Sequence, residues 1–166
     1  MSDKNYMGID QSFTSCGVIV LNQKSKVVHS STIKSPKTDG IDIFDRAWFI
    51  AKKVSDLINE YTPERVGLEG LAFSKFGDAT RDLAGLQFIL VNHLRRVHSY
   101  DNLIIVSPNE LKKFATTRGN AKKEQMVDSL PKNVLESFQK QNFKKTTGLY
   151  DVTDAYWIAK YVSDHS

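Results

Sequence analysis

The chain has 166 residues, of which 40% are apolar or aromatic, so it is long enough for one compact domain with a buried core, expected over residues 1–166. No apolar run approaches the roughly 20 residues of a membrane span, and the polar amino terminus does not resemble a signal peptide. Both observations predict a soluble, intracellular protein without a membrane partner. The net charge of +4 favours an anionic partner only weakly.

The first part of the chain predicts an antiparallel meander, a helix and a fourth strand. The first three strands are expected at residues 6–10, 16–21 and 27–33. Cys16 lies in the second strand, so we expect a small core residue rather than a nucleophile. Residues 41–58 carry apolar side chains at three- and four-residue steps, which predicts a helix. Its expected core face contains Ile41, Phe44, Trp48, Ala51, Val54 and Ile58. Pro63 ends this unit before a strand at residues 65–69.

A long helix with two apolar stripes is predicted at residues 78–97. The first stripe contains Ala79, Leu83, Leu86, Leu90, Leu94 and Val97. The second contains Ala84, Phe88 and Val91. One stripe is enough to cover a sheet, so the second predicts either a two-fold dimer partner or a neighbouring helix of the same chain.

The last third of the chain is predicted to be mostly helical. We expect a strand at residues 103–106, helices at 109–115, 121–130 and 150–162, and a loop at 132–147. The order of elements along the chain predicts an α/β domain with a mixed sheet. This order is compatible with the RNase H-like fold and with several others, so topology alone names no function.

Positive charge is concentrated between residues 110 and 145. This segment holds nine basic residues and four acidic ones, so it supplies +5 and leaves the remainder close to neutral. The basic residues are Lys112, Lys113, Arg118, Lys122, Lys123, Lys132, Lys140, Lys144 and Lys145. The cluster favours a nucleic-acid partner, and a solvated lysine-rich surface is an equally open interpretation.

Four carboxylates stand out by their positions. Asp10 ends the first predicted strand and Glu69 ends the fourth, while Asp151 and Asp154 lie three residues apart on one face of the last helix. If the two strands are parallel neighbours, Asp10 and Glu69 leave the sheet at the same end, where open α/β folds usually place their sites. The last helix then has only to cross that end to bring all four acids together.

Such a cluster has a specific chemical use. Two carboxylates about 4 Å apart repel by roughly 4 kcal/mol at an effective dielectric constant near 20, so several together need cations. Hard oxygen ligands favour Mg²⁺ or Mn²⁺, and a metal pair promotes in-line displacement at phosphorus. Taken singly, each acid has an ordinary explanation. Asp10 is also typical of a turn, and Asp151 and Asp154 are typical of a helix amino terminus.

Four segments resemble the motifs of the RuvC family of Holliday-junction resolvases, in the order of that family. MGIDQSFTSCG at residues 7–17 resembles the opening motif, and VGLEGLAFSK at residues 66–75 resembles the second. The stretch at residues 107–123 is similar to the family's basic segment, and DVTDA at residues 151–155 resembles its closing acidic motif. No single motif is specific, but four in register over nearly the whole chain predict membership.

The resemblance implies an RNase H-like fold, with a five-stranded mixed sheet flanked by helices. It implies a homodimer, paired through its long central helices, that cuts four-way DNA junctions symmetrically with Mg²⁺ or Mn²⁺, two ions per site. The implied metal ligands are Asp10, Glu69, Asp151 and Asp154. Lys123 is implied as a catalytic residue that stabilises the phosphate in the transition state, with an ordinary exposed lysine as the alternative. The implied DNA-binding residues are Phe73, Lys75, Lys112, Lys113, Arg118 and Lys122.

The chain also departs from the family pattern. Gln11 and Ser12 replace the usual proline and glycine after the first aspartate, and the lysine-rich stretch before the last helix is long. Both features resemble divergent versions encoded by bacteriophages, which predicts action in the cytoplasm of a bacterium or of a phage-infected host. They also predict activity on forks and flaps in addition to four-way junctions.

Two other functions compete with the nuclease. A catalytically silent junction-binding protein on the same fold would share the basic segment, although all four acids are present. The segment at residues 8–15 also resembles the phosphate loop of actin-like sugar kinases. Such phosphotransferases need two domains and a second phosphate loop, for which this chain is too short.

Overall fold

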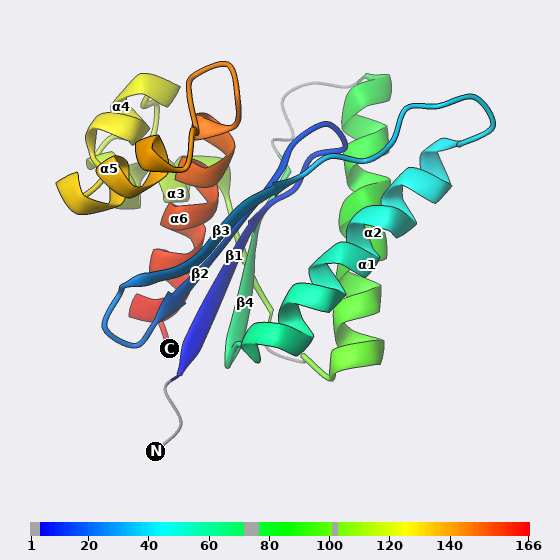
Figure 1. Ribbon diagram of the computed structural model, residues 1–166, viewed down its shortest axis with the longest axis horizontal. Helices are drawn as coiled ribbons and strands as arrows, with labels where there is room; N and C mark the ends of the chain where they lie inside the picture. The colour runs from blue at the N-terminus through cyan, green and yellow to red at the C-terminus, as the bar shows by residue number, and fades with distance from the viewer. Residues whose placement is uncertain (1–3, 72–76, 101–102) are drawn as a thin grey trace.

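The computed structural model describes residues 4–71, 77–100 and 103–166, which form a five-stranded sheet with helices on both faces (Figure 1). The strands are β1 (Asn5–Asp10), β2 (Cys16–Asn22), β3 (Val27–Ile33), β4 (Arg65–Glu69) and β5 (Ile104–Val106). Their order across the sheet is β3-β2-β1-β4-β5. The first three strands are antiparallel, and β4 lies parallel to both β1 and β5. The predicted meander and mixed sheet are therefore confirmed.

The helices divide between the two faces of the sheet. They are α1 (Ile43–Tyr61), α2 (Asp78–His98), α3 (Pro108–Thr116), α4 (Lys123–Asp128), α5 (Lys132–Lys140) and α6 (Leu149–Asp164). α1 and α2 cover one face, while α6 covers the other with α3, α4 and α5 packed beyond it (Figure 1). Each face has its own buried apolar cluster. None of the helices in the described ranges combines the length and apolar character that crossing a membrane requires.

α6 lies unusually close to the sheet because glycines line its path. A Cβ atom on Gly8 would lie 2.2 Å from the carbonyl oxygen of Ala155 and 2.4 Å from the amide nitrogen of Ala159. A Cβ on Gly17 would lie 2.2 Å from the carbonyl oxygen of Asp151. Real Cβ atoms do not approach backbone this closely, so only glycine at both positions lets α6 rest on β1 and β2.

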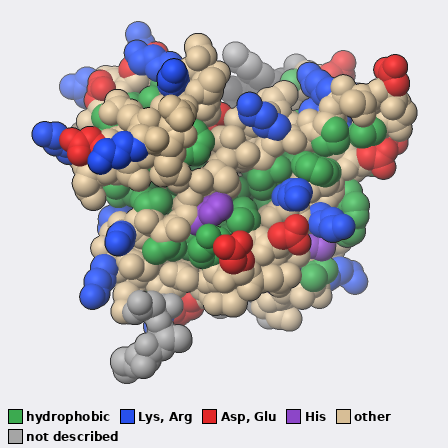
Figure 2. All heavy atoms as spheres, in the orientation of Figure 1, with side chains coloured by type: hydrophobic (Ala, Val, Ile, Leu, Met, Phe, Trp, Pro, Cys, Tyr) green, Lys and Arg blue, Asp and Glu red, His purple; other side chains and the backbone are tan. Residues whose placement is uncertain are grey.

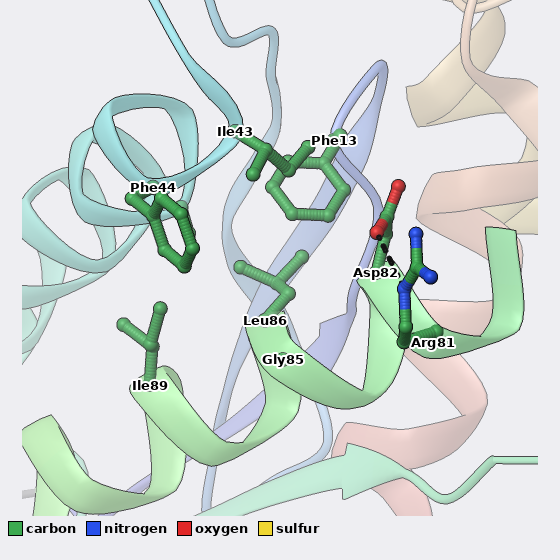
Figure 3. A pocket seen from close by; sticks show the side chains of 9 residues that line it. Phe13, Ile43, Phe44, Arg81, Asp82, Gly85, Leu86 and Ile89 are labelled. Atoms are coloured by element: carbon green, nitrogen blue, oxygen red, sulfur yellow. Dashed lines mark ion pairs between the residues drawn. The ribbon is translucent and has the colours of Figure 1, made fainter. Parts of the chain in front are cut away.

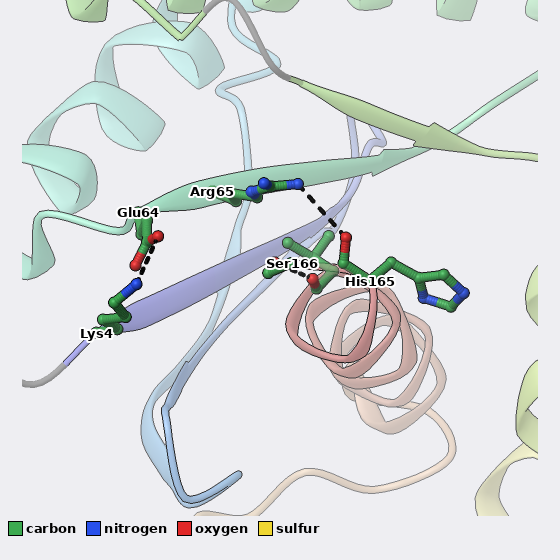
Figure 4. A network of polar contacts seen from close by, with 6 residues as sticks. Lys4, Glu64, Arg65, His165 and Ser166 are labelled. Atoms are coloured by element: carbon green, nitrogen blue, oxygen red, sulfur yellow. Dashed lines mark hydrogen bonds and ion pairs between the residues drawn. The ribbon is translucent and has the colours of Figure 1, made fainter.

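Polar contacts connect the elements at the end of the sheet where β1 and β4 begin. Lys4 Nζ lies 2.9 Å from Glu64 Oε1, and Arg65 Nη1 donates to the carbonyl oxygen of His165 at 3.4 Å (Figure 4). The Ser166 hydroxyl donates to the carbonyl oxygen of Val162. These contacts connect β4 and the chain before β1 to the carboxyl end of α6 and its flanking residues. The contacts lie far from the sheet end at which β1 and β4 finish.

The prediction of a loop at residues 132–147 is wrong in its first half, where α5 forms. Pro131 precedes this helix, and Val134 and Phe138, four residues apart, are buried in the α6-side cluster. Two buried side chains on one face are enough to hold a nine-residue helix against a neighbour. Most residues around Val134 and Phe138 are polar, so the sequence pattern of this segment predicted a loop instead of a helix.

The predicted core face of α1 is wrong at its start. Asp42 caps the helix by accepting from the amides of Phe44 and Asp45, so Ile41 lies outside it. The side chains of Phe44 and Trp48 are 72% and 56% exposed. The residues buried instead are Ala47, Ile50 and Ser55, together with the predicted Ala51, Val54 and Ile58. The helix is rotated so that mainly aliphatic side chains face the core, while Phe44 and Trp48 do not.

The first stripe of α2 is confirmed in its centre, where Leu86, Leu90 and Leu94 are buried. The stripe is wrong at its ends, where Ala79 and Val97 are exposed. Cys16 is buried, as predicted.

Candidate active site

Asp10 and Glu69 leave adjacent parallel strands at the same end of the sheet. The register pairs Ile9 of β1 with Leu68 of β4, so the next residues, Asp10 and Glu69, are neighbours at the carboxyl ends of their strands. The residues before each of them are apolar and buried, and this burial fixes the strand ends. This is the arrangement that the two strand positions predict.

The first two turns of α6 bring Asp151 and Asp154 to the same place. In the β1–β2 pairing, Asp10 lies opposite Gly17, and the backbone of Asp151 rests directly on Gly17. The Ser15 hydroxyl donates to Asp151 Oδ2 at 2.6 Å, which orients that carboxylate from the β1–β2 loop. Asp154 lies one turn further along the same helix face. Three separate elements therefore deliver four carboxylates to one end of the sheet.

Burial and the charges of neighbouring acids disfavour the ionised forms of Asp10, Glu69 and Asp154. The pKa of Asp10 is raised well above its ordinary value, first by burial and then by the charges of Asp154, Glu69 and Asp151. Burial, followed by the charge of Asp154, raises the pKa of Glu69 to about 7. Burial raises the pKa of Asp154 to about 6. The charges of these acids therefore raise one another's pKa values, a pattern that is typical of functional carboxylate clusters.

Two lysines oppose this repulsion from outside the cluster. The charge of Lys123, at the start of α4, lowers the pKa of Asp10, Glu69 and Asp154, and that of Lys112 lowers the last two. Lys123 Nζ also lies 5.5 Å from the centre of the Tyr150 ring, a cation–π contact that holds it beside α6. Both lysines are therefore near enough to act on an anion bound at the carboxylates.

The donor set fits a hard divalent cation. Carboxylate oxygens are the ligands that Mg²⁺ and Mn²⁺ prefer, and a divalent charge would relieve the repulsion that raises these pKa values. Within residues 4–71, 77–100 and 103–166, no three Asp, Glu, His or Cys side chains are already gathered as ligands of one ion. The carboxylates thus share one environment, and binding an ion requires side-chain movement toward it.

The family model of crossover junction endodeoxyribonuclease RuvC matches residues 6–159 of the chain. The chain belongs to the RuvC family. It is 29% identical over 160 residues to the RuvC of Prosthecochloris aestuarii, covering 92% of this chain and 78% of that protein. It is 28% identical over 126 residues to the RuvC of Brachyspira hyodysenteriae, covering 73% of this chain and 75% of that protein.

Solved structures confirm the predicted RNase H-like fold. Thermus thermophilus RuvC in complex with a Holliday junction substrate has a TM-score of 0.73 at 18% identity, covering 94% of this chain and 90% of that chain. The yeast mitochondrial Holliday junction resolvase has a TM-score of 0.66 at 16% identity, covering 95% of this chain and 76% of that chain. At these identities the likeness shows the fold, and the roles of individual residues in this RuvC-family chain still depend on its own geometry.

The remaining predicted DNA-binding residues fall into two groups. Lys113, Arg118 and Lys122 are exposed on α3 and on the connection from α3 to α4. In the orientation of Figure 1, Lys and Arg side chains gather over the α4 and α5 side of the molecule (Figure 2). Phe73 and Lys75, both from the second RuvC motif, lie outside the described residues. Their proposed contacts with DNA stay predictions.

Gln11 and Ser15 support the acids, and sequence reasoning missed both. Gln11 is buried, and its Nε2 donates to the carbonyl oxygen of Glu69 at 3.1 Å and to Gln87 Oε1 at 2.8 Å. It therefore connects the end of β4 to α2. In the sequence, Gln11 is distinguished by replacing the proline that RuvC proteins usually have after the first aspartate. Ser15 had no signal beyond its place in the first motif, because its partner is 136 residues away.

An apolar cavity of about 260 Å³ lies on the other face of the sheet, between α1 and α2. Phe13, Phe44 and Ile89 project around it, and the Arg81–Asp82 ion pair, 3.8 Å from Nε to Oδ1, borders it (Figure 3). Its lining is mainly hydrocarbon and has no group of acids suited to a metal ion. We therefore place the chemistry at the carboxylates and not in this cavity.

Proposed function

We propose that this RuvC-family chain is a structure-selective endonuclease that resolves Holliday junctions by metal-dependent hydrolysis of phosphodiester bonds. The observation that carries the proposal is the convergence of Asp10, Glu69, Asp151 and Asp154, from three elements, at one end of the sheet. The family match over residues 6–159 supplies the reaction class. Action in the cytoplasm of a bacterium or phage-infected host is part of the proposal.

The four carboxylates would hold Mg²⁺, with Mn²⁺ as a substitute and two ions per site. Bound there, the ions supply a Lewis acid and an activated water for in-line attack at phosphorus. Ser15 holds the Asp151 carboxylate in one orientation, and Gln11 fixes the backbone at Glu69. Lys123 stands beside the acids, where its charge stabilises the phosphate as negative charge develops on it. The protein thus contributes orientation and a preformed field.

The DNA-binding surface extends from this centre over the basic segment. Lys112, Lys113, Arg118 and Lys122 would contact backbone phosphates, and this placement suits a substrate recognised by the shape of its branch point. Phe73 is proposed to stack on an unpaired base at the crossover, with Lys75 beside it on the backbone. Forks and flaps share that geometry, so we include them as substrates.

A homodimer is proposed to bring two such sites to one four-way junction. Phe88 of the second α2 stripe is 77% exposed, and no helix of the described chain covers it. A two-fold axis beside α2 would bury this stripe against its copy and leave both carboxylate clusters free. Two symmetric cuts would follow from two symmetric sites.

The rival is a catalytically silent junction-binding protein on the same fold. It predicts junction binding without metal-dependent cleavage. The deciding experiment incubates the wild type and Asp10→Asn with labelled four-way, three-way and linear DNA in Mg²⁺, Mn²⁺ or chelator. Asp56→Asn, an exposed acid on α1, is the matched control.

We expect symmetric cuts in four-way DNA by the wild type and the control only with metal, and binding without cleavage by Asp10→Asn. Full activity of Asp10→Asn would refute the metal site. Absence of cleavage by the wild type in both metals would support the silent binder.

A further inference from the structure

A second polar pocket adjoins the carboxylate cluster. Its volume is about 330 Å³, and it shares Asp151 and Lys123 with the centre described above. The rest of its lining comes from the β1–β2 loop, from the residue after β3, and from the turn that leads into α6. Lys34 and Lys145 lie in these segments, and neither belongs to the site proposed so far.

The pocket carries excess positive charge. Lys34, Lys123 and Lys145 line it against a single carboxylate, that of Asp151, which the Ser15 hydroxyl already engages. None of the three lysines is within ion-pair distance of an acid in the described parts of the chain. The charge of Lys123 also acts on the neighbouring acids and that of Lys145 on Glu124. Three lysines that line one cavity without a direct ion pair still attract an anion, because the repulsion among them is then offset.

The pocket wall is built and held in place. Ser30 on β3 donates its hydroxyl to Gln141 Oε1 at 2.7 Å, which connects β3 to the end of α5. The amide of Lys144 donates to Thr147 Oγ1 at 3.0 Å, and the Thr147 hydroxyl donates to the carbonyl oxygen of Asn142 at 3.2 Å. These bonds close the turn that presents Lys145, so this lysine is on a fixed support.

Gly148 seats this turn against β3. Its φ of +91° is one that glycine adopts without strain, and a Cβ there would lie 2.9 Å from Thr32 Cγ2. The segment leading into α6, orange in Figure 1, is therefore brought beside β3, and Lys145 and Lys34 line the same cavity. Two lysines that are 111 residues apart in the chain therefore line one pocket.

We propose that this pocket binds a backbone phosphate of the DNA strand being cut, next to the phosphate held at the carboxylate cluster. The inference rests on the proposed nuclease function and deepens it. Asp151 and Lys123 are common to both sites, so an anion in the pocket lies directly beside the reaction centre. Successive phosphates of one strand have the required sequence of charges, and a strand held at two points is fixed in direction across the metal ligands.

The first test measures the salt dependence of junction binding in an Asp10→Asn background, which prevents cleavage. The variant Lys34→Ala/Lys145→Ala should lower the slope of log affinity against log salt by about 0.9, because each phosphate that the protein neutralises contributes about 0.9 and the pocket binds one phosphate. The charge-matched control is Lys24→Ala/Lys26→Ala, in the β2–β3 turn at the opposite end of the sheet. An unchanged slope, or an equal change in the control, overturns the proposal.

The second test locates the phosphate. Neutral methylphosphonates replace, one at a time, the phosphates within two positions of the cut. Affinity for each substituted junction is measured with the Asp10→Asn parent and with the Lys34→Ala/Lys145→Ala variant made in that background. At one position next to the cut, the loss of affinity seen with the parent protein should disappear in Lys34→Ala/Lys145→Ala. Equal losses for both proteins at every position overturn the proposal. Wild-type cleavage of the junction, measured separately, decides the proposed function independently of either result.

Discussion

The two faces of the sheet differ in how they pack and in the charges that they bury. On the α6 face, glycines bring backbone against backbone, and buried acids stand within reach of one another's charge. On the α1 and α2 face, an apolar cluster packs in the usual way, and aromatic side chains such as Phe44 and Phe88 remain exposed. Both faces bury an apolar cluster, but the α6 face also positions the acids, and the α1 and α2 face has apolar side chains left exposed for a partner.

This difference predicts where substitutions will matter. Changes on the α6 face should alter chemistry and close packing, and changes on the exposed side of α2 should alter assembly. Each prediction below compares a change on one face with a matched change elsewhere, in order of decreasing expected effect.

Lys123→Met should reduce the cleavage rate by about 10²–10³-fold, because it removes a positive charge that acts on three of the acids. Single-turnover cleavage of a four-way junction at saturating protein measures this effect apart from binding. Lys132→Met, an exposed lysine on α5, is the matched control and should cut normally. A loss confined to affinity, with the saturated rate intact, would make Lys123 an ordinary DNA contact.

Gly8→Ala should lower the free energy of unfolding by about 3 kcal/mol, because its Cβ would meet the α6 backbone at 2.2 Å. Gly85→Ala on α2 is the control from the other face. A Cβ there meets nothing within 4 Å, so alanine should stabilise the helix by up to about 1 kcal/mol. Urea unfolding measures both. Equal effects at the two glycines would contradict the close contact of α6 with β1.

Metal-free protein should lose stability as the pH rises from about 4.5 to 7. The pKa of Glu69 is about 7 in the fold against an ordinary 4.5, so folding favours the protonated form. The stabilisation is complete below the lower value and is lost through the higher one, by roughly 2–3 kcal/mol. Urea unfolding in chelator at pH 5 and pH 8 measures the loss.

Glu69→Gln is the control for this titration, because residue 69 can then no longer ionise and the profile should become less steep, with Asp10 and Asp154 accounting for the slope that remains. Mg²⁺ or Mn²⁺ should restore stability at pH 8 more than at pH 5, where protons compete with the ion. A wild-type profile no steeper than that of the variant would contradict a buried Glu69 whose pKa is raised by burial and by Asp154.

Phe88→Ser should weaken the proposed dimer by about 2 kcal/mol, or roughly thirtyfold in its dissociation constant, if the ring is buried against a second copy. Val28→Ser, an exposed apolar residue on the edge strand β3, is the control. Sedimentation equilibrium distinguishes them. If neither substitution shifts the monomer–dimer equilibrium, the exposed α2 stripe is not the dimer interface.

The sequence predicted the parts of the fold whose signals are local. Apolar runs located the strands, and the strand-end positions of Asp10 and Glu69 follow from parallel pairing of β1 and β4. The periodicity of Leu86, Leu90 and Leu94 gave the buried side of α2. Each of these signals lies within a few residues, where side-chain period alone decides the structure.

Features that depend on distant partners could not be predicted. α5 is held by Val134 and Phe138 packing into a cluster contributed largely by other elements, and its own composition is that of a loop. The hydrogen bond from Ser15 to Asp151, and the pocket that Lys34 and Lys145 both line, exist only once α6 rests on the sheet. The bacteriophage origin and the roles of Phe73 and Lys75 stay predictions.

The most direct test of the account is a crystal structure of the protein grown with Mn²⁺, with anomalous scattering recorded at the manganese edge. We expect anomalous peaks among the carboxylates of Asp10, Glu69, Asp151 and Asp154, with these side chains drawn inward from their metal-free positions. Manganese bound elsewhere, or absent from this cluster at a concentration that supports cleavage, would contradict the claim that these four acids form the metal centre.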